Sequence, residues 1–228
     1  MAGKDPKIFV IFGNKGGTGK SMLAEHLAVY LAETDLDRSV VLMDLDARQG
    51  DSLLFASGRT EKWADAPAVD AFAPKDVPEL QAAFTRLAKI GANIVVDCPP
   101  ADSPLAMEAC RHAEAIIFPF RAGAHDLRAL GRATEIARAT YRPDRPPVLL
   151  AAVNFFDQRT LEARIALDAL KERSYVFTFV GVISQRTSIN EALMVNLAAW
   201  ELRPKSPAAK ETRSVCANAV NALNARFK

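Results

Sequence analysis

The sequence predicts an α/β fold in which helices cover both faces of a doubly wound, mostly parallel sheet. Apolar runs typical of buried strands alternate with segments of helical spacing along nearly the whole chain of 228 residues. The first run leads into a glycine-rich loop, and two later runs each end at an aspartate. No internal repeat or linker interrupts the alternation, so we expect a single domain over residues 1–228.

The composition is that of an ordinary globular protein, with 50% hydrophobic residues and a formal net charge of +2. Because the charge is nearly balanced, binding to nucleic acid would require a local basic patch. Three cysteines without metal-type spacing, and a start without the apolar core of a signal peptide, favour a reducing cytoplasm. No window approaches the roughly eighteen apolar residues of a spanning helix, so we expect no integral membrane association.

A phosphate-binding loop follows the first strand. The apolar run over residues 8–12 ends in a loop from Gly13 to Ser21, and leucines at helical spacing come next. A loop at a helix N-terminus presents backbone N–H groups to an anion, and glycines let the main chain wrap around a phosphate. Lys20 can reach the outer phosphates, and the Ser21 hydroxyl can hold Mg²⁺. The residues expected to bind the nucleotide here are Gly16, Gly17, Thr18, Gly19, Lys20, Ser21 and Met22.

The loop departs from the usual pattern, which has glycine five residues before Gly19, where this chain has Asn14. The stretch from Lys15 to Ser21 resembles the deviant Walker A loop of the ParA/MinD family of dimeric P-loop ATPases. In that family the extra lysine, matched by Lys15, reaches across an ATP-dependent homodimer to the partner's phosphates. Such a cation resembles an arginine finger, which stabilises charge where it develops. The alternative for Lys15 is a solvated loop lysine.

A second group of acids follows the strand predicted over residues 39–43. Its end at Asp44 lies on the ligand-binding edge of a parallel sheet. Residues 44–52 resemble the family's second motif, although Ala47 replaces a proline and Arg48 shifts the glutamine by one. The resemblance implies that Asp46 orients the attacking water and that Asp44 supports that site. It also implies that Asp51 is a switch residue and a candidate Mg²⁺ ligand. An ordinary polar loop is the alternative.

The strand predicted over residues 93–97 ends at Asp97, and the run Asp-Cys-Pro-Pro that follows resembles the family's next motif. Asp97 is expected to contact Mg²⁺ through water, because magnesium keeps several waters when it binds a nucleotide. Cys98 and Cys110 raise the alternative of an iron–sulfur protein, as in the related nitrogenase iron-protein group. They lack the glycine-rich loops of that group, so we expect core or loop thiols.

Other elements follow in order. Residues 56–79 are the least regular part and are expected to form a mobile segment near the nucleotide, with a short strand at 69–72. Further helices are predicted over 21–33, 81–89, 103–112, 126–140, 161–170 and 207–227, and further strands over 115–120, 147–153 and 175–183. Asp126 is either an N-cap or, as the resemblance implies, a dimer-interface contact.

The base of the nucleotide is expected near Asn154, because an asparagine at the end of this strand contacts adenine in the family. A guanine site normally has lysine after that asparagine, and Phe155 stands there instead. ATP is therefore favoured as the cofactor, together with Mg²⁺, while Asp157 leaves GTP open.

The C-terminal region is locally basic, with seven Lys or Arg against three Glu from Ile183 onward. It resembles the tail of small partition ATPases, and a two-fold dimer would double the charge that faces DNA phosphates. The DNA-binding candidates are Arg186, Lys205, Lys210 and Arg213. Arginines 128, 132, 138 and 142 on the helix over 126–140 are either a solvated face or a further DNA contact. An ordinary basic helix end is the alternative for the C-terminal charge.

Taken together, these residues predict an ATP-dependent switch ATPase that dimerises, binds non-specific DNA at the nucleoid and partitions or positions a cargo. Too few residues precede the first strand for a fused helix-turn-helix domain, so we expect a separate site-specific DNA-binding or cargo adaptor protein that stimulates hydrolysis. The alternative is a MinD-like regulator attached to the membrane surface. The apolar stripe of the last helix is rich in small alanines, which favours packing against the domain over lipid attachment.

Overall fold

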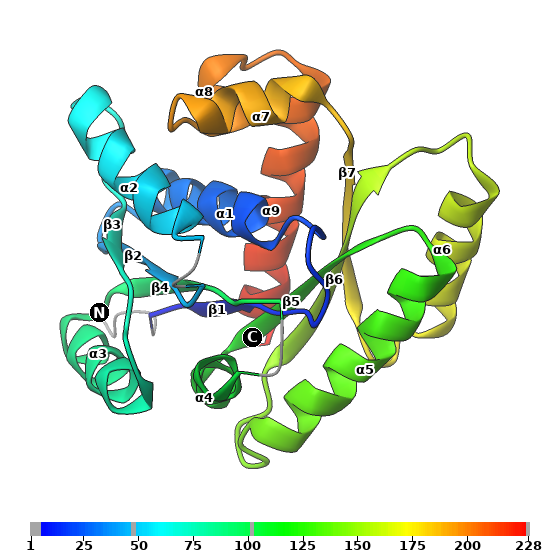
Figure 1. Cartoon of the computed structure of the whole chain (residues 1–228), viewed down its shortest axis with the longest axis horizontal. Helices are drawn as coiled ribbons and strands as arrows, with labels where there is room; N and C mark the ends of the chain where they lie inside the picture. Colours follow the sequence, from blue (N-terminus) through cyan, green and yellow to red (C-terminus); the bar gives the residue numbers. More distant parts are fainter. Residues whose placement is uncertain (1–5, 47–48, 101–102, 227–228) are drawn as a thin grey trace.

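The computed structural model describes residues 6–46, 49–100 and 103–226. Helices surround one seven-stranded sheet (Figure 1). The strands are β1 (Ile8–Ile11), β2 (Val40–Asp44), β3 (Asp70–Phe72), β4 (Asn93–Asp97), β5 (Ala115–Arg121), β6 (Val148–Phe156) and β7 (Thr178–Ser184). The helices are α1 (Lys20–Thr34), α2 (Asp51–Lys62), α3 (Val77–Ile90), α4 (Pro104–His112), α5 (Ala124–Thr140), α6 (Leu161–Glu172), α7 (Thr187–Met194), α8 (Ala199–Leu202) and α9 (Pro207–Ala225).

The strand order is β3-β2-β4-β1-β5-β6-β7, and every pairing in it is parallel. The central strand β1 therefore lies between β4 and β5. After β1 the chain forms β2, β3 and β4 on one side of β1, and then β5, β6 and β7 on the other side. This is the point where an open parallel sheet binds ligands at the carboxyl ends of its strands. The doubly wound α/β fold is confirmed, and the described sheet is wholly parallel.

Alternate residues of β1 divide the core into two layers. Phe9 and Ile11 pack with residues of α1, α2, α7, α8 and α9. Val10 belongs to a second cluster with residues of α3, α4, α5 and α6. Figure 1 shows these two groups of helices on opposite sides of the sheet. The β1 run is apolar throughout because both of its faces are covered.

The described helices begin in different ways. Serine, threonine or aspartate side chains cap α3, α4, α6 and α9. In contrast, α1 and α2 begin after the left-handed glycines Gly19 and Gly50 and have no side-chain cap in the described structure. The N–H groups in the first turn of α1 are therefore open to a bound anion, whereas in α2 the N–H of Leu53 already binds Asp44 Oδ2 at 3.1 Å.

Two sequence predictions are wrong. Residues 56–62, expected in an irregular mobile segment, belong to α2, and Arg59 in this helix is buried. The short strand at 69–72 is confirmed as β3. Asp126 is not an N-cap, because Gly123 occupies that position and Asp126 is the third residue of α5.

None of the described helices combines the length and apolarity needed to cross a bilayer.

Candidate functional site

The glycine-rich loop joins β1 to α1 between the ends of β4 and β5. Gly17 and Gly19 adopt left-handed backbone with φ of 69° and 84°, which glycine tolerates without steric cost. Gly19 is also required by its neighbour, because a Cβ atom there would lie 2.6 Å from Asn154 Nδ2. The predicted loop is thus confirmed as a tight turn at a helix N-terminus.

Lys20 is the first residue of α1 and is only 7% exposed. Its Nζ atom donates to the carbonyl of Lys15 across the loop, at 3.2 Å. Burial lowers the pKa of Lys20, while Asp97, Cys98 and Asp46 act in the opposite direction. The ammonium group therefore lies inside the loop. An anionic ligand there would compensate its positive charge, which burial removes from water.

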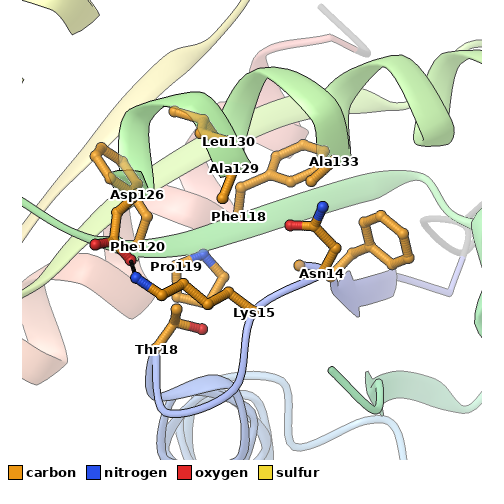
Figure 2. Close-up of a pocket in the computed structure, with 12 residues that line it drawn as sticks. Asn14, Lys15, Thr18, Phe118, Pro119, Phe120, Asp126, Ala129, Leu130 and Ala133 are labelled. Atoms are coloured by element: carbon orange, nitrogen blue, oxygen red, sulfur yellow. Dashed lines mark hydrogen bonds and ion pairs between the residues drawn. The ribbon is translucent and has the colours of Figure 1, made fainter. Parts of the chain in front are cut away.

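Lys15 is held by an acid of its own chain. Its Nζ atom lies 2.9 Å from Asp126 Oδ1, and its side chain is 45% exposed. Figure 2 shows this ion pair at the edge of a small pocket below α5, beside Asn14 and the aromatic residues Phe118 and Phe120. The extra lysine thus contacts α5. Asp126 is not the N-cap of that helix, and Lys15 is not a freely solvated loop lysine.

Asp97 is the centre of a buried acidic group. Its Oδ2 atom accepts from Ser52 Oγ at 2.9 Å, and the residue is 2% exposed. Burial raises the pKa of Asp97 to about 6, although hydrogen bonds from the Ser21 and Ser52 hydroxyls and the charge of Lys20 act to lower it. Asp97 and Asp44 are direct register partners on β4 and β2, as expected for aspartates at the same sheet edge.

Asp44 organises the loop that follows β2. Its Oδ1 accepts from the backbone N–H of Asp46 at 3.0 Å, and its Oδ2 accepts from that of Leu53 at 3.1 Å. Asp46 itself is half-buried, and Asp51 is exposed at the first position of α2. The Ala47 and Arg48 variation lies outside the described residues. Asp44 is therefore a brace for Asp46 and the start of α2.

Sequence reasoning did not assign a role to Glu25, one turn along α1 from Ser21. Glu25 is 4% exposed. Burial raises its pKa well above the usual range, and the charges of Asp97, Asp51 and Asp44 act in the same direction. Its position in the middle of an otherwise apolar helical pattern is the signal that could have drawn attention to it.

The polar atoms left over around the loop fit a nucleotide with Mg²⁺. Thr18 Oγ1 and Asp97 Oδ1 are buried and have no hydrogen-bond partner among the described residues. The Ser21 hydroxyl beside the Asp97 carboxylate offers the oxygen ligands that magnesium prefers. No group of three or more His, Cys, Asp or Glu side chains within the described ranges forms a complete metal site.

Asn154 lies behind the loop. It is fully buried, and its Nδ2 atom donates to the Thr18 carbonyl at 2.8 Å. Asn154 thus supports the loop, and its Oδ1 atom is buried without a hydrogen-bond partner among the described residues. Its contact with the base stays a prediction. The neighbouring strand ends border a cavity of about 520 Å³, lined by residues that include Phe155, Asp157 and Glu211. Asp157 is already paired with Arg159, whose hydrogen bonds lower the pKa of Asp157 to about 2.

Two more residues at the site were missed. Ser52 binds Asp97, and its place after a run of polar residues gave no hint of burial. Arg121, at the end of β5, donates from Nε to the Gly17 carbonyl at 3.0 Å. An arginine directly after an apolar strand was the signal that could have identified it.

The DNA-binding candidates divide into two pairs. Arg186 lies 2.7 Å from Glu211, and Arg213 lies 2.6 Å from Glu33. Lys205 and Lys210 are exposed, and neither makes an ion pair within the described residues. Elsewhere, Cys98, Cys110 and Cys216 are free and buried, as expected for core thiols.

A family profile described as the CobQ/CobB/MinD/ParA nucleotide binding domain matches residues 9–198. The chromosome-partitioning ATPase Soj of Thermus thermophilus is 29% identical over 226 residues, covering 87% of this chain and 89% of Soj. The solved cell division ATPase MinD of Pyrococcus furiosus has a TM-score of 0.74 at 18% identity, covering 94% of this chain and 98% of its own. A putative plasmid partition protein from Borrelia burgdorferi, bound to AMPPNP, has a TM-score of 0.75 at 18% identity, covering 95% and 99%. The two solved structures support the fold.

Proposed function

The chain belongs to the CobQ/CobB/MinD/ParA nucleotide-binding family, and from this membership we propose a Mg²⁺-dependent ATPase that works as a dimerising switch. It partitions or positions DNA or another cytoplasmic cargo. ATP favours a homodimer that binds non-specific DNA, and hydrolysis releases it. A separate DNA-binding or cargo adaptor protein stimulates that hydrolysis. The similarity to Soj, a chromosome-partitioning ATPase, supports the positioning role.

One observation carries the ATPase proposal. The phosphate loop, buried Lys20 and the Asp97–Ser52 pair meet at the carboxyl ends of neighbouring parallel strands. A helix N-terminus without a side-chain cap adds backbone donors to the same place. Phosphoryl transfer needs this combination of positioned donors, a cation and metal-binding oxygens.

The residues divide the work as follows. Lys20 and the loop N–H groups bind the phosphates, and Ser21 and Asp97 hold Mg²⁺, with Asp51 as a further candidate ligand. When bound, the metal neutralises charge on the phosphate oxygens. Asp46 orients the attacking water, and the hydrogen bond from its N–H to Asp44 fixes its backbone. The reaction converts ATP and water to ADP and phosphate.

Lys15 contributes to the partner's site. In the single chain it is paired with Asp126, on the exposed side of the loop. Dimerisation with ATP exchanges this contact for the phosphates of the facing subunit, where an added cation stabilises the developing charge. The switch therefore depends on moving one lysine between two anionic partners.

A MinD-like regulator at the membrane surface is the second candidate, favoured by the structural likeness to Pyrococcus furiosus MinD. The apolar stripe of α9 speaks against attachment through that helix, because the described part of the stripe is buried against the domain. The buried residues are Ala209, Thr212, Val215, Cys216, Ala219, Val220 and Leu223. Phe227, which the sequence adds to the stripe, lies outside the described residues. ATP-dependent pelleting with anionic liposomes would support this second candidate.

The ATPase proposal is tested by steady-state hydrolysis with Mg²⁺ and ATP, comparing the wild type with Lys20→Ala. Because Lys20 supplies the buried cation of the loop, we expect the rate to fall at least about 100-fold. Lys89→Ala, which removes an exposed lysine on α3, is the matched control and should hydrolyse ATP like the wild type. Equal rates for the wild type and Lys20→Ala would contradict the proposal.

A further inference from the structure

Two neighbouring strand ends hold three successive carbonyls of the phosphate loop. Arg121 and Asn154 are register partners on β5 and β6. Arg121 Nε donates to the Gly17 carbonyl at 3.0 Å. Asn154 Nδ2 donates to the carbonyl of Thr18 at 2.8 Å and lies 3.4 Å from that of Gly19. The loop backbone is therefore tied to the sheet edge by side chains from outside its own motif.

These bonds affect the side of the loop that faces a ligand. In a planar trans peptide the C=O and the following N–H point in opposite directions. Carbonyls 17–19 are held toward Arg121 and Asn154, so the N–H groups of residues 18–20 point the other way. Successive N–H groups that converge in this manner form an anion-binding concavity. Arg121 thereby influences donors that it does not itself contact.

Arg121 is held in turn by an unusual aromatic residue. Its guanidinium group lies 4.3 Å from the centroid of the Phe155 ring, within the range of a cation–π contact. Phe155 has φ of 54°, a left-handed conformation that is rare for a bulky side chain and marks functional positions. Phe155 also lines the cavity of about 520 Å³ at the ends of β6 and β7 and a second one of about 130 Å³ that reaches Met22.

We propose that Arg121 is a positioning residue for the nucleotide phosphates, oriented by Phe155 and acting through the Gly17 carbonyl. The inference rests on the proposed nucleotide site and adds a residue outside the loop motif. The planar guanidinium can stack on an aromatic ring and donate from Nε at the same time, and a lysine ammonium cannot. Arginine at position 121 is therefore required for its geometry, and its positive charge alone is not sufficient.

The position of Arg121 allows a clean test. It is the last residue of β5 and is exposed, so substitution leaves the core unchanged. Arg128 on α5 is also exposed, and within the described part of the chain its side chain bonds to His125 rather than to the loop. Arg128→Lys and Arg128→Gln are therefore matched controls for the same changes at position 121.

The measurement is the Kd for inorganic tripolyphosphate and for ATP, by competition with a fluorescent nucleotide. Tripolyphosphate has no base, so any effect on its affinity must come through the phosphate site. We expect both Arg121→Lys and Arg121→Gln to weaken both ligands about fivefold or more, the worth of one hydrogen bond. Phe155→Leu should also weaken tripolyphosphate, and Arg121→Lys/Phe155→Leu should bind no more weakly than Arg121→Lys alone. Unchanged thermal unfolding midpoints would show that the fold persists.

Several outcomes would overturn the inference. Wild-type affinity in Arg121→Lys would show that geometry is not needed, and equal losses at position 128 would show a general effect of charge. Additive losses in the double variant would show that Phe155 does not act through Arg121. If the wild type binds no more ATP than Lys20→Ala does, the proposed function itself is overturned. That result differs from one in which the wild type binds ATP and Arg121 has no role.

Discussion

At the scale of single residues, His26 shows how a polar side chain on an apolar helix face can be structural. It is fully buried, with Nδ1 2.7 Å from the Met22 carbonyl and Nε2 3.1 Å from the Ala199 backbone N. Nδ1 must therefore carry the proton and Nε2 must accept. The ring also packs edge-on against Trp200. His26 thus joins α1 to α8 as a neutral imidazole.

His26 makes stability depend on pH. Burial lowers its pKa from 6.5 to about 4, so the unfolded chain binds the extra proton between these values. The contribution is complete above pH 6.5 and is lost as the pH falls toward 4, by up to about 3 kcal/mol. His26→Gln should lower the free energy of unfolding at pH 7.5 and remove this dependence.

Urea unfolding of both proteins at pH 7.5, 6.0 and 5.0 checks the prediction. The comparison isolates His26 from Glu25 and Asp97, whose raised pKa values act in the opposite direction. Parallel pH profiles for the two proteins would contradict the assignment.

The Lys15–Asp126 pair makes a second prediction at this scale. Asp126→Asn removes the charge that retains Lys15 in its own chain, so ATP-dependent dimerisation should become tighter. The pair is partly exposed, and such pairs contribute less than about 1 kcal/mol, so we expect an effect of up to about fivefold. Sedimentation velocity with ATP measures it, with the exposed Asp144→Asn as control. Weaker dimerisation in Asp126→Asn would mean that Asp126 serves the dimer contact instead.

At the scale of elements, α2 connects the candidate site to the C-terminal helices. Its first turn holds Asp97 through Ser52. Near its other end, Arg59 is 1% exposed and makes two bonds with Glu201, at 2.8 and 2.6 Å. Sequence patterning could not find this helix, because Leu54 faces solvent with 65% exposure while an arginine lies inside. Tertiary ion pairing reversed the usual arrangement.

The stability of the fold should therefore depend on the Arg59–Glu201 pair. Glu201→Ala leaves the buried Arg59 guanidinium with the carbonyls of Pro67 and Asn196 but without its carboxylate partner, and it should lower the free energy of unfolding by about 3 kcal/mol. Urea denaturation measures the change. Glu172→Ala, which removes an exposed acid of α6, should have little effect. Equal stability of the two variants would show that Arg59 is solvated in the folded protein.

The elements that sequence did predict share a simple physical cause. Runs such as residues 8–12 and 93–97 are apolar throughout because both sheet faces are covered, so length and bounding residues identify them. Asp44 and Asp97 follow such runs, and parallel pairing brings them together at one edge. Local pattern could draw attention to Arg121 and Glu25, but the contacts that give Arg121, Glu25 and Ser52 their surroundings join distant segments, which no local pattern encodes. The bond from Asn154 to the loop was missed because side-chain direction follows from packing.

At the scale of the whole molecule, the exposed lysines of the C-terminal region define the expected DNA contact. Arg186 and Arg213 are engaged by acids of the same chain, so Lys205 and Lys210 should contribute most. With ATP, Lys205→Ala/Lys210→Ala should weaken binding to non-specific duplex. The slope of log K against log salt should fall by about one for each lost phosphate contact.

Fluorescence anisotropy over a salt series, with ATP, ADP or no nucleotide, tests this expectation. Lys75→Ala/Lys89→Ala removes two exposed lysines around α3 and is the charge-matched control. Binding that ignores the nucleotide, or that both double variants weaken equally, would contradict a specific C-terminal DNA surface.

The central claim is that two subunits share each ATPase site, with Asp46 from one and Lys15 from the other. Lys15→Ala and Asp46→Ala should each be inactive alone, because every homodimer site lacks one group. In an equal mixture, half of the dimers are heterodimers that contain one complete site, so hydrolysis should recover to about a quarter of the wild-type rate. If Lys15 instead serves its own subunit, no dimer in the mixture has a complete site and the rate stays at background, which would contradict the account.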